Sequence, residues 1–378
     1  MGGETMRIAF VVAGLGAGGA EKIVNIVAHH RQDQGDEIHV LAINANDSAS
    51  FFPYDPGIAV EALSPACGRS GMTLRRLFAL RRRLQILKPD LVVSFLTKVN
   101  VLTSLASTGL PHALIASERN NRARQPMNLV WRVLFAGALR RSSVLVMQTE
   151  SAARDLPKIL RRRSVTIPNL VFPVEGEFVR KPGTPPRIVA VGRLDRQKGF
   201  DLLLHAFARV RSDLDTVSLT IFGEGPERDK LEELVGHLQL RHCVELPGVS
   251  ASPGGWLRPG DIYVLSSRFE GFPNALLEAL SAGMATISFD CPWGPAEIVS
   301  DEKDGILVGA EDVGGLARAL QRLATDDALR ERLAAAGPGV AARFAPAILL
   351  DKWDAAISRS VEIHRRLAAH VIEMGAIR

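Results

Sequence analysis

Cysteine is scarce in this sequence. The 378 residues include only Cys67, Cys243 and Cys291, which are an odd number, lie far apart and form no Cys-x-x-Cys pair. This pattern argues against a disulfide framework and against a zinc site, and it is typical of a protein from a reducing compartment.

Aromatic residues and long apolar runs are also few. Phe, Trp and Tyr make up 6% of the chain, and the basic clusters contain few of them for stacking on bases, so we expect no nucleic-acid partner. The first seven residues do not form a signal peptide, and the apolar run at 8–13 is far too short to span a membrane. We therefore expect a soluble, cytoplasmic protein.

Positive charge is concentrated in the first half of the chain. Residues 1–186 contain 24 Lys and Arg against 14 Asp and Glu, whereas the remainder contains 22 against 27. One basic cluster, at 75–88, has leucines at helical spacing, which predicts a basic amphipathic helix. Such a helix either packs its leucines on a core with a solvated basic face, or is attracted to anionic lipid headgroups.

Short apolar runs alternate with helical patterns along the whole chain. The runs are rich in Val, Ile and Leu, as buried parallel strands are, and a proline-rich stretch divides them into two series. This order predicts two doubly wound α/β domains facing across a cleft. The predicted parts are an N-terminal domain at 1–170, a linker at 171–186, a C-terminal domain at 187–345 and a C-terminal helix at 346–378 that packs on the N-terminal domain.

A glycine-rich loop follows the first predicted strand. Residues 14–19 (GLGAGG) match the G-x-G-x-x-G pattern of dinucleotide-binding proteins, which leaves a dehydrogenase as an alternative function. No acid follows the second strand to bind a ribose, since residues 43–46 read INAN. The loop otherwise indicates backbone amides that approach an anion or a sugar, or an ordinary tight turn.

Two loops of the second series point to a phosphate ligand. Residues 192–199 (GRLDRQKG) place Arg193 and Lys198 after a strand, where doubly wound sheets bind ligands, and two cations there suit a diphosphate. Residues 223–225 (GEG) form another strand-to-helix loop, with Glu224 between two glycines. Each loop alone is also compatible with ordinary turn chemistry.

The most informative segment is 268–278 (RFEGFPNALLE). Pro273 suits the first helical turn, which places Glu270 in the preceding loop and Glu278 inside the helix. The amides around 271–275 are then expected to be free to bind a diphosphate at the positive end of the helix dipole. Glu270 can accept hydrogen bonds from sugar hydroxyls, and Glu278, among apolar neighbours, needs a partner such as ribose hydroxyls.

Together these segments resemble the retaining glycosyltransferases of family GT4, which have the GT-B fold of two Rossmann-like domains. The resemblance covers nearly the whole chain and rests on the Gly-Gly-Ala-Glu loop at 18–21, on 192–198, on 223–225 and on the Glu-x7-Glu pair of Glu270 and Glu278. Residues 94–100, 117–120 and 289–297 are similar to a bacterial subgroup. That subgroup includes amylovoran-type exopolysaccharide transferases, and N-acetylgalactosaminyltransferases that build lipid-linked glycans are related to it.

The resemblance implies a hexose or N-acetylhexosamine transferase that uses a nucleotide sugar, with uridine diphosphate as the expected carrier, and that needs no metal or other cofactor. Arg193 and Lys198 would hold the donor diphosphate, Glu278 the ribose and Glu270 the transferred sugar. The full set of expected donor-binding residues is Gly18, Gly19, Arg193, Lys198, Gly223, Glu224, Glu270, Gly271, Phe272, Pro273, Asn274, Ala275 and Glu278. The expected acceptor-side or sugar contacts are Asn100, Ser117, Glu118, Arg119 and Asn120.

Arg119 departs from the family pattern. Many relatives have a histidine where this chain has Arg119, and a guanidinium stays protonated and cannot act as a base. We therefore expect Glu270 and Arg119 as the catalytic residues, with a charge-stabilising role for Arg119. The expected acceptor is a polyprenyl-diphosphate-linked glycan, and the Arg-rich helices of the first domain are expected to bind the anionic inner face of the plasma membrane. A catalytically inert nucleotide-sugar-binding protein is the remaining alternative.

Overall fold

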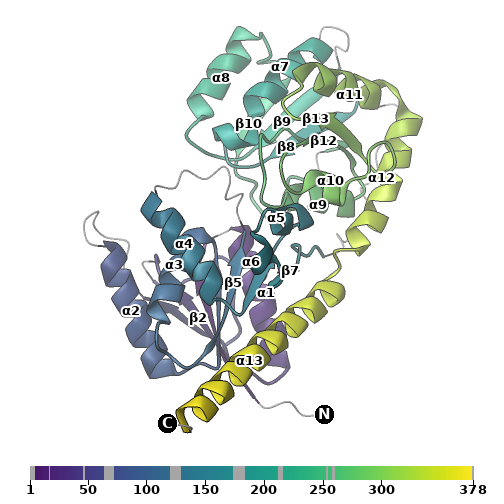
Figure 1. The fold of residues 1–378 in the computed structure, drawn as a ribbon. Coiled ribbons are helices and arrows are strands. Elements are labelled where there is room, and N and C mark those ends of the chain that lie inside the picture. The colour runs from purple at the N-terminus through teal and green to yellow at the C-terminus, as the bar shows by residue number, and fades with distance from the viewer. Residues whose placement is uncertain are drawn as a thin grey trace. The chain divides into compact units, whose positions relative to one another are not determined.

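The protein consists of two compact units. The first contains Met1–Asn169 and Ala347–Arg378, and the second contains Leu170–Pro346 (Figure 1). The computed structural model describes residues 5–16, 18–45, 47–63, 72–119, 129–172, 184–211, 216–252, 254–257 and 260–376. Most of the predicted linker, 171–186, lies outside these ranges.

The first unit is built on a seven-stranded sheet. Its neighbouring strands pair in parallel, in the order β3-β2-β1-β4-β5-β6-β7. The strands are β1 (Arg7–Val12), β2 (Glu37–Ala42), β3 (Ala59–Ala62), β4 (Leu91–Phe95), β5 (Ala113–Glu118), β6 (Val144–Met147) and β7 (Ser164–Thr166). The central strands are buried almost throughout, because helices cover both faces of the sheet.

Helices connect these strands. They are α1 (Gly19–Asp33), α2 (Met72–Leu87), α3 (Thr97–Ala106), α4 (Leu129–Arg141), α5 (Glu150–Arg154), α6 (Lys158–Arg161) and the C-terminal α13 (Pro346–Ala376). Alternate side chains of a strand point to opposite faces, so Ala9 and Val11 join the core under α2 and α3. Phe10 points the other way, to Phe95, whose ring lies 5.8 Å from that of Trp353 in α13.

The second unit repeats this architecture with six strands. Its sheet order is β10-β9-β8-β11-β12-β13, again parallel. The strands are β8 (Arg187–Val191), β9 (Ser218–Phe222), β10 (Val244–Gly248), β11 (Ile262–Leu265), β12 (Ala285–Asp290) and β13 (Ile306–Gly309). The helical elements are the 3-10 turn η1 (Arg196–Lys198), α7 (Phe200–Arg211), α8 (Arg228–His237), α9 (Asn274–Ser281), α10 (Pro295–Ile298), α11 (Val313–Thr325) and α12 (Asp327–Ala342).

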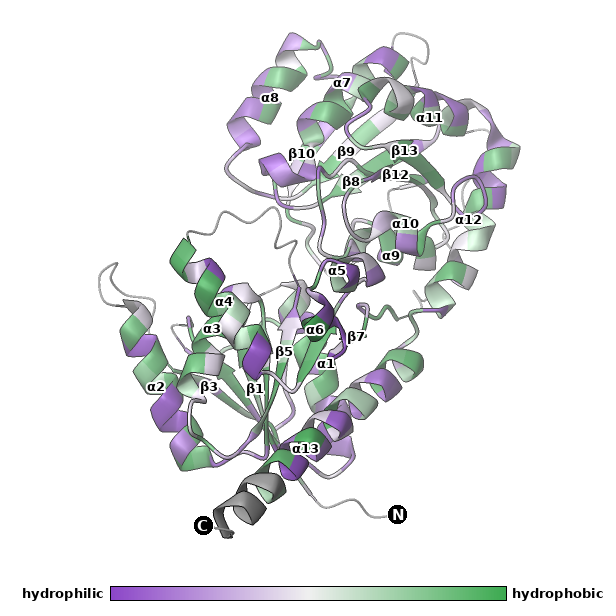
Figure 2. Cartoon of the chain, viewed as in Figure 1, coloured by the Kyte–Doolittle hydropathy of each residue, from purple (hydrophilic) through white to green (hydrophobic). Residues whose placement is uncertain are grey.

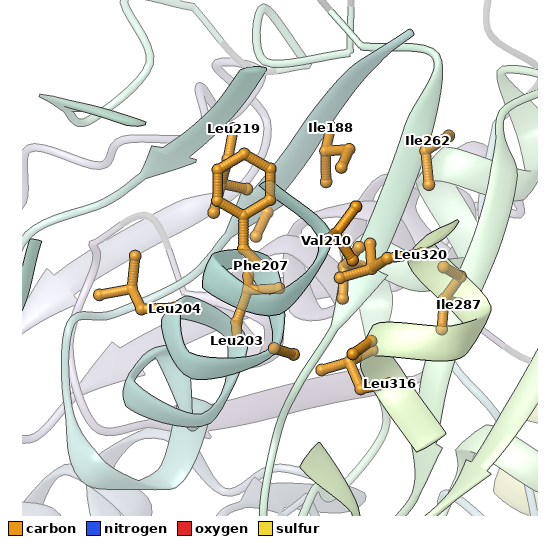
Figure 3. Packing of buried hydrophobic residues seen from close by; sticks show 14 of the residues in the cluster. Ile188, Leu203, Leu204, Phe207, Val210, Leu219, Ile262, Ile287, Leu316 and Leu320 are labelled. Atoms are coloured by element: carbon orange, nitrogen blue, oxygen red, sulfur yellow. The ribbon is translucent and has the colours of Figure 1, made fainter. Parts of the chain in front are cut away.

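The core of the second unit lies between the sheet and two of its helices. Phe207 of α7 and Leu316 of α11 are fully buried and pack in one cluster with strand residues such as Ile188 and Ile287 (Figure 3). The strands are predominantly hydrophobic, whereas the helices alternate hydrophobic and hydrophilic residues (Figure 2). This one-sided pattern is what amphipathic helices on a buried parallel sheet require.

The strand order reverses once in each sheet. In the second unit the chain runs outward from β8 through β9 to β10 and then returns to β11 on the other side of β8. The loops after β8 and β11 therefore leave adjacent strands in different directions, and open α/β sheets typically bind ligands in a crevice at such a position. The same reversal separates β1 from β4 in the first unit.

Helix α13 anchors the C-terminal end of the chain to the first unit. It buries Leu349, Trp353 and Ile357, and Asp354 accepts hydrogen bonds from His30 and Arg31 of α1, both at 2.9 Å. By length and composition alone, the stretch Asp327–Ala369 is apolar enough to cross a membrane, a test that core helices of soluble proteins also pass.

We expect Trp353→Ala to lower the free energy of unfolding by about 3–5 kcal/mol, because it empties a fully buried site against Phe95. Lys352→Ala, at the exposed neighbouring position, is the matched control and should change it by less than about 0.5 kcal/mol. Urea unfolding measures both. Equal values for the two variants would show that α13 does not depend on this contact.

Candidate active site

An ion pair joins the two loops at the strand reversal of the second unit. Lys198 ends the turn η1 after β8, and Glu270 lies in the loop after β11. The Lys198 Nζ is 2.7 Å from the Glu270 Oε1, and the Glu270 side chain is only 6% exposed. A carboxylate buried to this degree needs a partner. The structure therefore brings together two predicted site residues that are 72 positions apart.

Neighbouring polar groups hold this pair in place. Ser267 donates a hydrogen bond of 2.6 Å to Glu270 Oε1, and Ser266 donates one of 2.9 Å to the Lys198 carbonyl. Both bonds to Glu270 end on Oε1, so among the described residues its Oε2 has no hydrogen bond and is available to a ligand. Gln197 donates to the carbonyl of Phe269 at 3.0 Å and connects the two loops a second time.

Arg193 occupies the same loop in a different setting. Its side chain is 70% exposed and pairs with Asp195 at 2.5 Å. Asp195 also caps η1, because its carboxylate accepts from the Lys198 amide. The Arg193 side chain is therefore exposed, whereas the Lys198 side chain is only 23% exposed.

Glycines permit the close backbone approach that the loops of this edge require. A Cβ on Gly223, whose φ is +144°, would lie 1.8 Å from the Gly192 carbonyl oxygen. Gly199, with φ +61°, would bring a Cβ to 2.1 Å from the Ser266 carbonyl oxygen. No other residue type fits these positions without displacing backbone.

Glu224, between the glycines of 223–225, is exposed and bound by Arg228 of α8, through bonds of 2.8 and 2.6 Å. This guanidinium lowers the pKa of Glu224. Sequence reasoning missed Arg228, although the spacing of four residues is typical of an ion pair on a helix. It also missed Arg268, which binds Asp201 with two bonds, of 2.8 and 2.7 Å, and thereby ties the β11 loop to α7.

The start of α9 differs in detail from the prediction. Pro273 is the residue before the helix rather than part of its first turn. The expectation that all amides of 271–275 are free is wrong for Asn274, because its N–H donates to the Phe272 carbonyl at 3.0 Å. Among the described residues, the amides of Gly271, Phe272 and Ala275 have no backbone acceptor, so they are the ones left for an anion.

The remaining residues of this segment face different surroundings. Phe272 is buried and its ring lies 5.8 Å from that of Phe344. Glu278 lies inside α9, as predicted from the spacing, between the buried Leu277 and Ala279. Both Glu270 and Glu278 contribute to the raised pKa of the buried Tyr263, after the larger effect of burial.

In the first unit, the predicted glycine loop lies between β1 and helix α1. Helix α1 begins at Gly19, with Gly18 before it in an extended conformation, and the Lys22 amide donates to the Gly18 carbonyl at 3.0 Å. Burial raises the pKa of Glu21 in the first turn. The Glu21 carboxylate is hydrogen-bonded to its own backbone in this turn, so it occupies part of the positive end of the helix.

The residues at the end of β5 form a buried polar cluster with residues of β4 and the start of α3. Thr97 donates to both carboxylate oxygens of Glu118 at 2.9 Å, and Ser117 Oγ accepts from the Nε of Arg119 at 2.9 Å. Asn100 accepts from Ser94 at 2.8 Å and donates to the Ser117 carbonyl at 3.1 Å, so it joins β4 to β5. Asn120, the last residue of this predicted set, lies outside the described residues.

Arg119 is far more enclosed than a surface loop residue. It is 7% exposed, bonds Asn169, and its guanidinium carbon lies 5.2 and 5.6 Å from the ring centres of Phe95 and Trp353. Burial lowers the pKa of Arg119 to about 9, and Glu118 opposes this effect. The side chain is therefore still a cation at neutral pH. Its Nη2 is buried without a hydrogen-bond partner among the described residues.

No cluster of three His, Cys, Asp or Glu side chains that could hold a metal ion occurs in the part of the chain that the structure describes.

Comparison with known proteins identifies a family for the second unit. The family described as "Glycosyl transferases group 1" matches residues 185–326, which contain the Lys198–Glu270 pair. An amylovoran biosynthesis glycosyltransferase of Erwinia amylovora is 25% identical, over 89% of this chain and 95% of its own length. An undecaprenol-linked-glycan α-1,4-N-acetyl-D-galactosaminyltransferase of Campylobacter jejuni is 26% identical, over 87% of this chain and 91% of its own length.

An exopolysaccharide phosphotransferase of Streptomyces coelicolor is 28% identical over 92% of this chain, but the chain spans only 40% of that relative's length. Among solved structures, a lipopolysaccharide outer core galactosyltransferase covers 93% of the chain with a TM-score of 0.74 at 19% identity. An Anabaena protein solved with UDP and glucose covers 93% with a TM-score of 0.75 at 17% identity. The predicted GT-B fold is confirmed, and the dehydrogenase alternative finds no support.

The buried pair should be energetically coupled, whereas the exposed pair in the same loop should not. For Lys198→Met, Glu270→Gln and the double variant, we expect a coupling free energy of about 1–3 kcal/mol in urea unfolding, because either single change leaves a buried group without its partner.

The matched cycle uses Arg193→Met and Asp195→Asn, for which solvent screening limits the coupling to less than about 1 kcal/mol. A Lys198–Glu270 coupling no larger than that of the exposed pair would contradict the structural role assigned to the buried pair.

Proposed function

We propose that this chain, which is similar to group 1 glycosyltransferases of the GT4 type and has the GT-B fold, is a retaining, metal-independent transferase. It moves a hexose or an N-acetylhexosamine from a uridine diphosphate sugar to a polyprenyl-diphosphate-linked glycan. The observation that carries this proposal is the Lys198–Glu270 pair at the strand reversal of the second unit. The enzyme acts in the synthesis of exopolysaccharide or lipid-linked glycan.

The donor sits in the crevice at the carboxyl ends of β8 and β11. Lys198 and Arg193 bind the diphosphate, together with the amides of Gly271 and Ala275 at the start of α9, where the helix dipole favours an anion. Glu278 binds the ribose hydroxyls. Glu270 offers its Oε2 to the hydroxyls of the transferred sugar while its Oε1 stays bound to Lys198 and Ser267.

The reaction exchanges one bond at the anomeric carbon for another. The bond from this carbon to the diphosphate oxygen breaks, the acceptor oxygen forms a bond on the same face, and the departing phosphate takes the acceptor proton. Negative charge grows on the diphosphate as the first bond breaks, so Lys198, Arg193 and the α9 amides stabilise the transition state more than the ground state. Arg119 stays charged and stabilises negative charge rather than removing a proton.

The choice of donor and acceptor follows the relatives. The Campylobacter transferase is named for an undecaprenol-diphosphate-linked acceptor, and the Anabaena structure contains UDP and glucose. A lipid-linked acceptor requires the enzyme to work at a membrane. We therefore place it in the cytoplasm, bound peripherally to the inner face of the plasma membrane.

Glu270→Gln and Lys198→Met should each lower kcat/KM for sugar transfer by about a hundredfold or more, the usual loss when one charge-stabilising group is removed. Transfer from a panel of nucleotide sugars to an undecaprenyl-diphosphate-linked glycan measures this, and proton NMR of the product gives the anomeric configuration. Lys230→Met, which removes an exposed cation of the same unit, is the control and should keep full activity.

Three results would overturn the proposal. Undiminished transfer in both site variants would show that this crevice is not the donor site. An inverted product would exclude the retaining mechanism. Donor binding, seen as a thermal shift in the wild-type protein, without turnover on any lipid-linked acceptor would favour a catalytically inert sugar-nucleotide-binding protein.

The membrane-binding surface is formed by exposed apolar and basic residues of α2. Leu74, Phe78 and Ile86 are 61%, 66% and 62% exposed, and Arg75 and Arg82 are exposed on the same helix. Apolar side chains interleaved with arginines are typical of helices that lie in an anionic lipid interface.

Only some of the arginines in the basic cluster of this helix have side chains without a hydrogen bond to another described part of the protein. Arg81 donates to the carbonyls of Ala106 and Thr108, at 2.8 and 2.7 Å, and Arg83 pairs with Glu61. The side chains of Arg81 and Arg83 therefore bond other parts of the protein, and Arg82 is the exposed member of this run.

Replacing Arg75 and Arg82 together by Gln should weaken binding to phosphatidylglycerol vesicles about thirtyfold, since each basic residue near an anionic surface contributes about 1 kcal/mol. Co-sedimentation measures the binding. Lys230→Gln with Arg318→Gln removes two exposed charges from the second unit and is the control. Equal losses of vesicle binding in the two double variants would show that the effect depends only on net charge. The proposed membrane-binding surface on α2 would then be wrong.

A further inference from the structure

A polar cavity lies in the first unit, at the edge of its sheet where several strands begin. It has a volume of about 260 Å³. His112, Ser143 and Arg163 line it, and each directly precedes a strand, β5, β6 and β7 respectively. The cavity is therefore at the amino ends of these strands, whereas the residues proposed for sugar transfer follow the carboxyl ends. Helix α13 contributes His364 to its wall.

Two buried polar atoms in this wall have no partner. The Nε2 of His112 and the Oγ of Ser107 make no hydrogen bond within the described residues. His112 is 7% exposed and Ser107 is 2% exposed, so bulk water does not compensate for the missing bonds. Buried polar groups in native proteins are nearly always hydrogen-bonded. Two such atoms in one cavity indicate a ligand that both can bind.

Two arginines in the same wall indicate that the ligand is an anion. Arg141, at the end of α4, donates to the Ser107 carbonyl at 3.1 Å, and Arg163 donates to the Arg140 carbonyl at 3.1 Å. A guanidinium has five N–H groups, and each of the two arginines uses only one of them in these bonds. Since the Ser107 hydroxyl can also donate, the wall offers more hydrogen-bond donors than the described residues use.

The cavity contains no acidic side chain among its described lining residues. Burial lowers the pKa of His112 to about 4, and the neighbouring His364 and Arg141 add to this effect. Burial also lowers the pKa of His364. Cationic and neutral donors thus gather here without a counter-ion, an arrangement that an anion would stabilise.

We propose that this cavity is a binding site for a phosphate group, held by Arg141, Arg163, Ser107 and His112. Arginine binds phosphate with several N–H groups at once, and the hydroxyl and imidazole supply further donors. The volume exceeds that of a single phosphate, and Leu110 and Ile363 add an apolar part to the wall. The site therefore also accepts a phosphate monoester with a short organic group, such as a lipid headgroup or a small metabolite.

The proposal is independent of the proposed transferase function, because none of these residues belongs to the donor or acceptor site. Its test uses the full chain and inorganic phosphate at constant ionic strength, with sodium chloride making up the balance. The signal of His112 in NMR spectra of protein with 13C-labelled histidine reports on the cavity itself, and a His112→Asn variant assigns it. Phosphate bound at the donor crevice leaves this signal unchanged.

We expect a saturable phosphate-dependent shift of the His112 signal, and a rise in the pKa of His112, because a bound anion favours the imidazolium form. Arg163→Gln and Ser107→Ala should each weaken phosphate binding, the first by about tenfold or more. Arg162→Gln is the matched control, since it removes the same charge from the same exposed turn but does not line the cavity.

The phosphate titrations distinguish binding at this cavity from a general effect of salt. Equal shifts with phosphate and with chloride, or equal phosphate affinity in wild type, Arg163→Gln and Ser107→Ala, would overturn the proposal. A loss in Arg162→Gln as large as that in Arg163→Gln would do so as well. Glycerol 3-phosphate as a second probe identifies the source: tighter binding than inorganic phosphate indicates an esterified ligand, and weaker binding indicates free phosphate.

Discussion

The ion pair between Lys198 and Glu270 connects two loops that leave the sheet of the second unit at adjacent strands. Adjacent parallel strands whose loops diverge occur where the strand order reverses, here between β8 and β11. Glu270 is buried, so its charge depends on Lys198 and Ser267. The same pair fixes the position of the carboxylate and of a cation beside it. In the proposed function, a donor diphosphate would therefore meet a site that is already assembled.

The first unit uses a cation differently. Arg119 packs against the rings of Phe95 and Trp353 and bonds Ser117 and Asn169, so it connects the end of β5 to the C-terminal helix. A residue predicted for catalysis is therefore also part of the packing of its unit. A permanently charged group in this position stabilises charge but does not accept a proton, which leaves acceptor deprotonation to the departing phosphate in the proposed mechanism.

Parts of the fold that the sequence pattern does not predict have local physical reasons. The edge strands β3 and β7 have four and three residues and are only half-buried, so they lack a clear apolar run. Helix α12 contains Pro338 between two glycines, which reads as a turn. Gly337 is required there because a Cβ would lie 2.5 Å from the Leu280 carbonyl oxygen of α9.

The sequence by itself determined the parallel α/β class, the division into two series of strands, and the loops that carry charged residues, because continuous apolar runs and glycine-rich strand ends are local signals. Only the tertiary structure decided which of these residues meet. Lys198 and Glu270 are 72 positions apart, Arg119 packs against Trp353, and His112 and Ser107 lack partners. Pairing and burial depend on strand order and helix packing, which no local pattern contains.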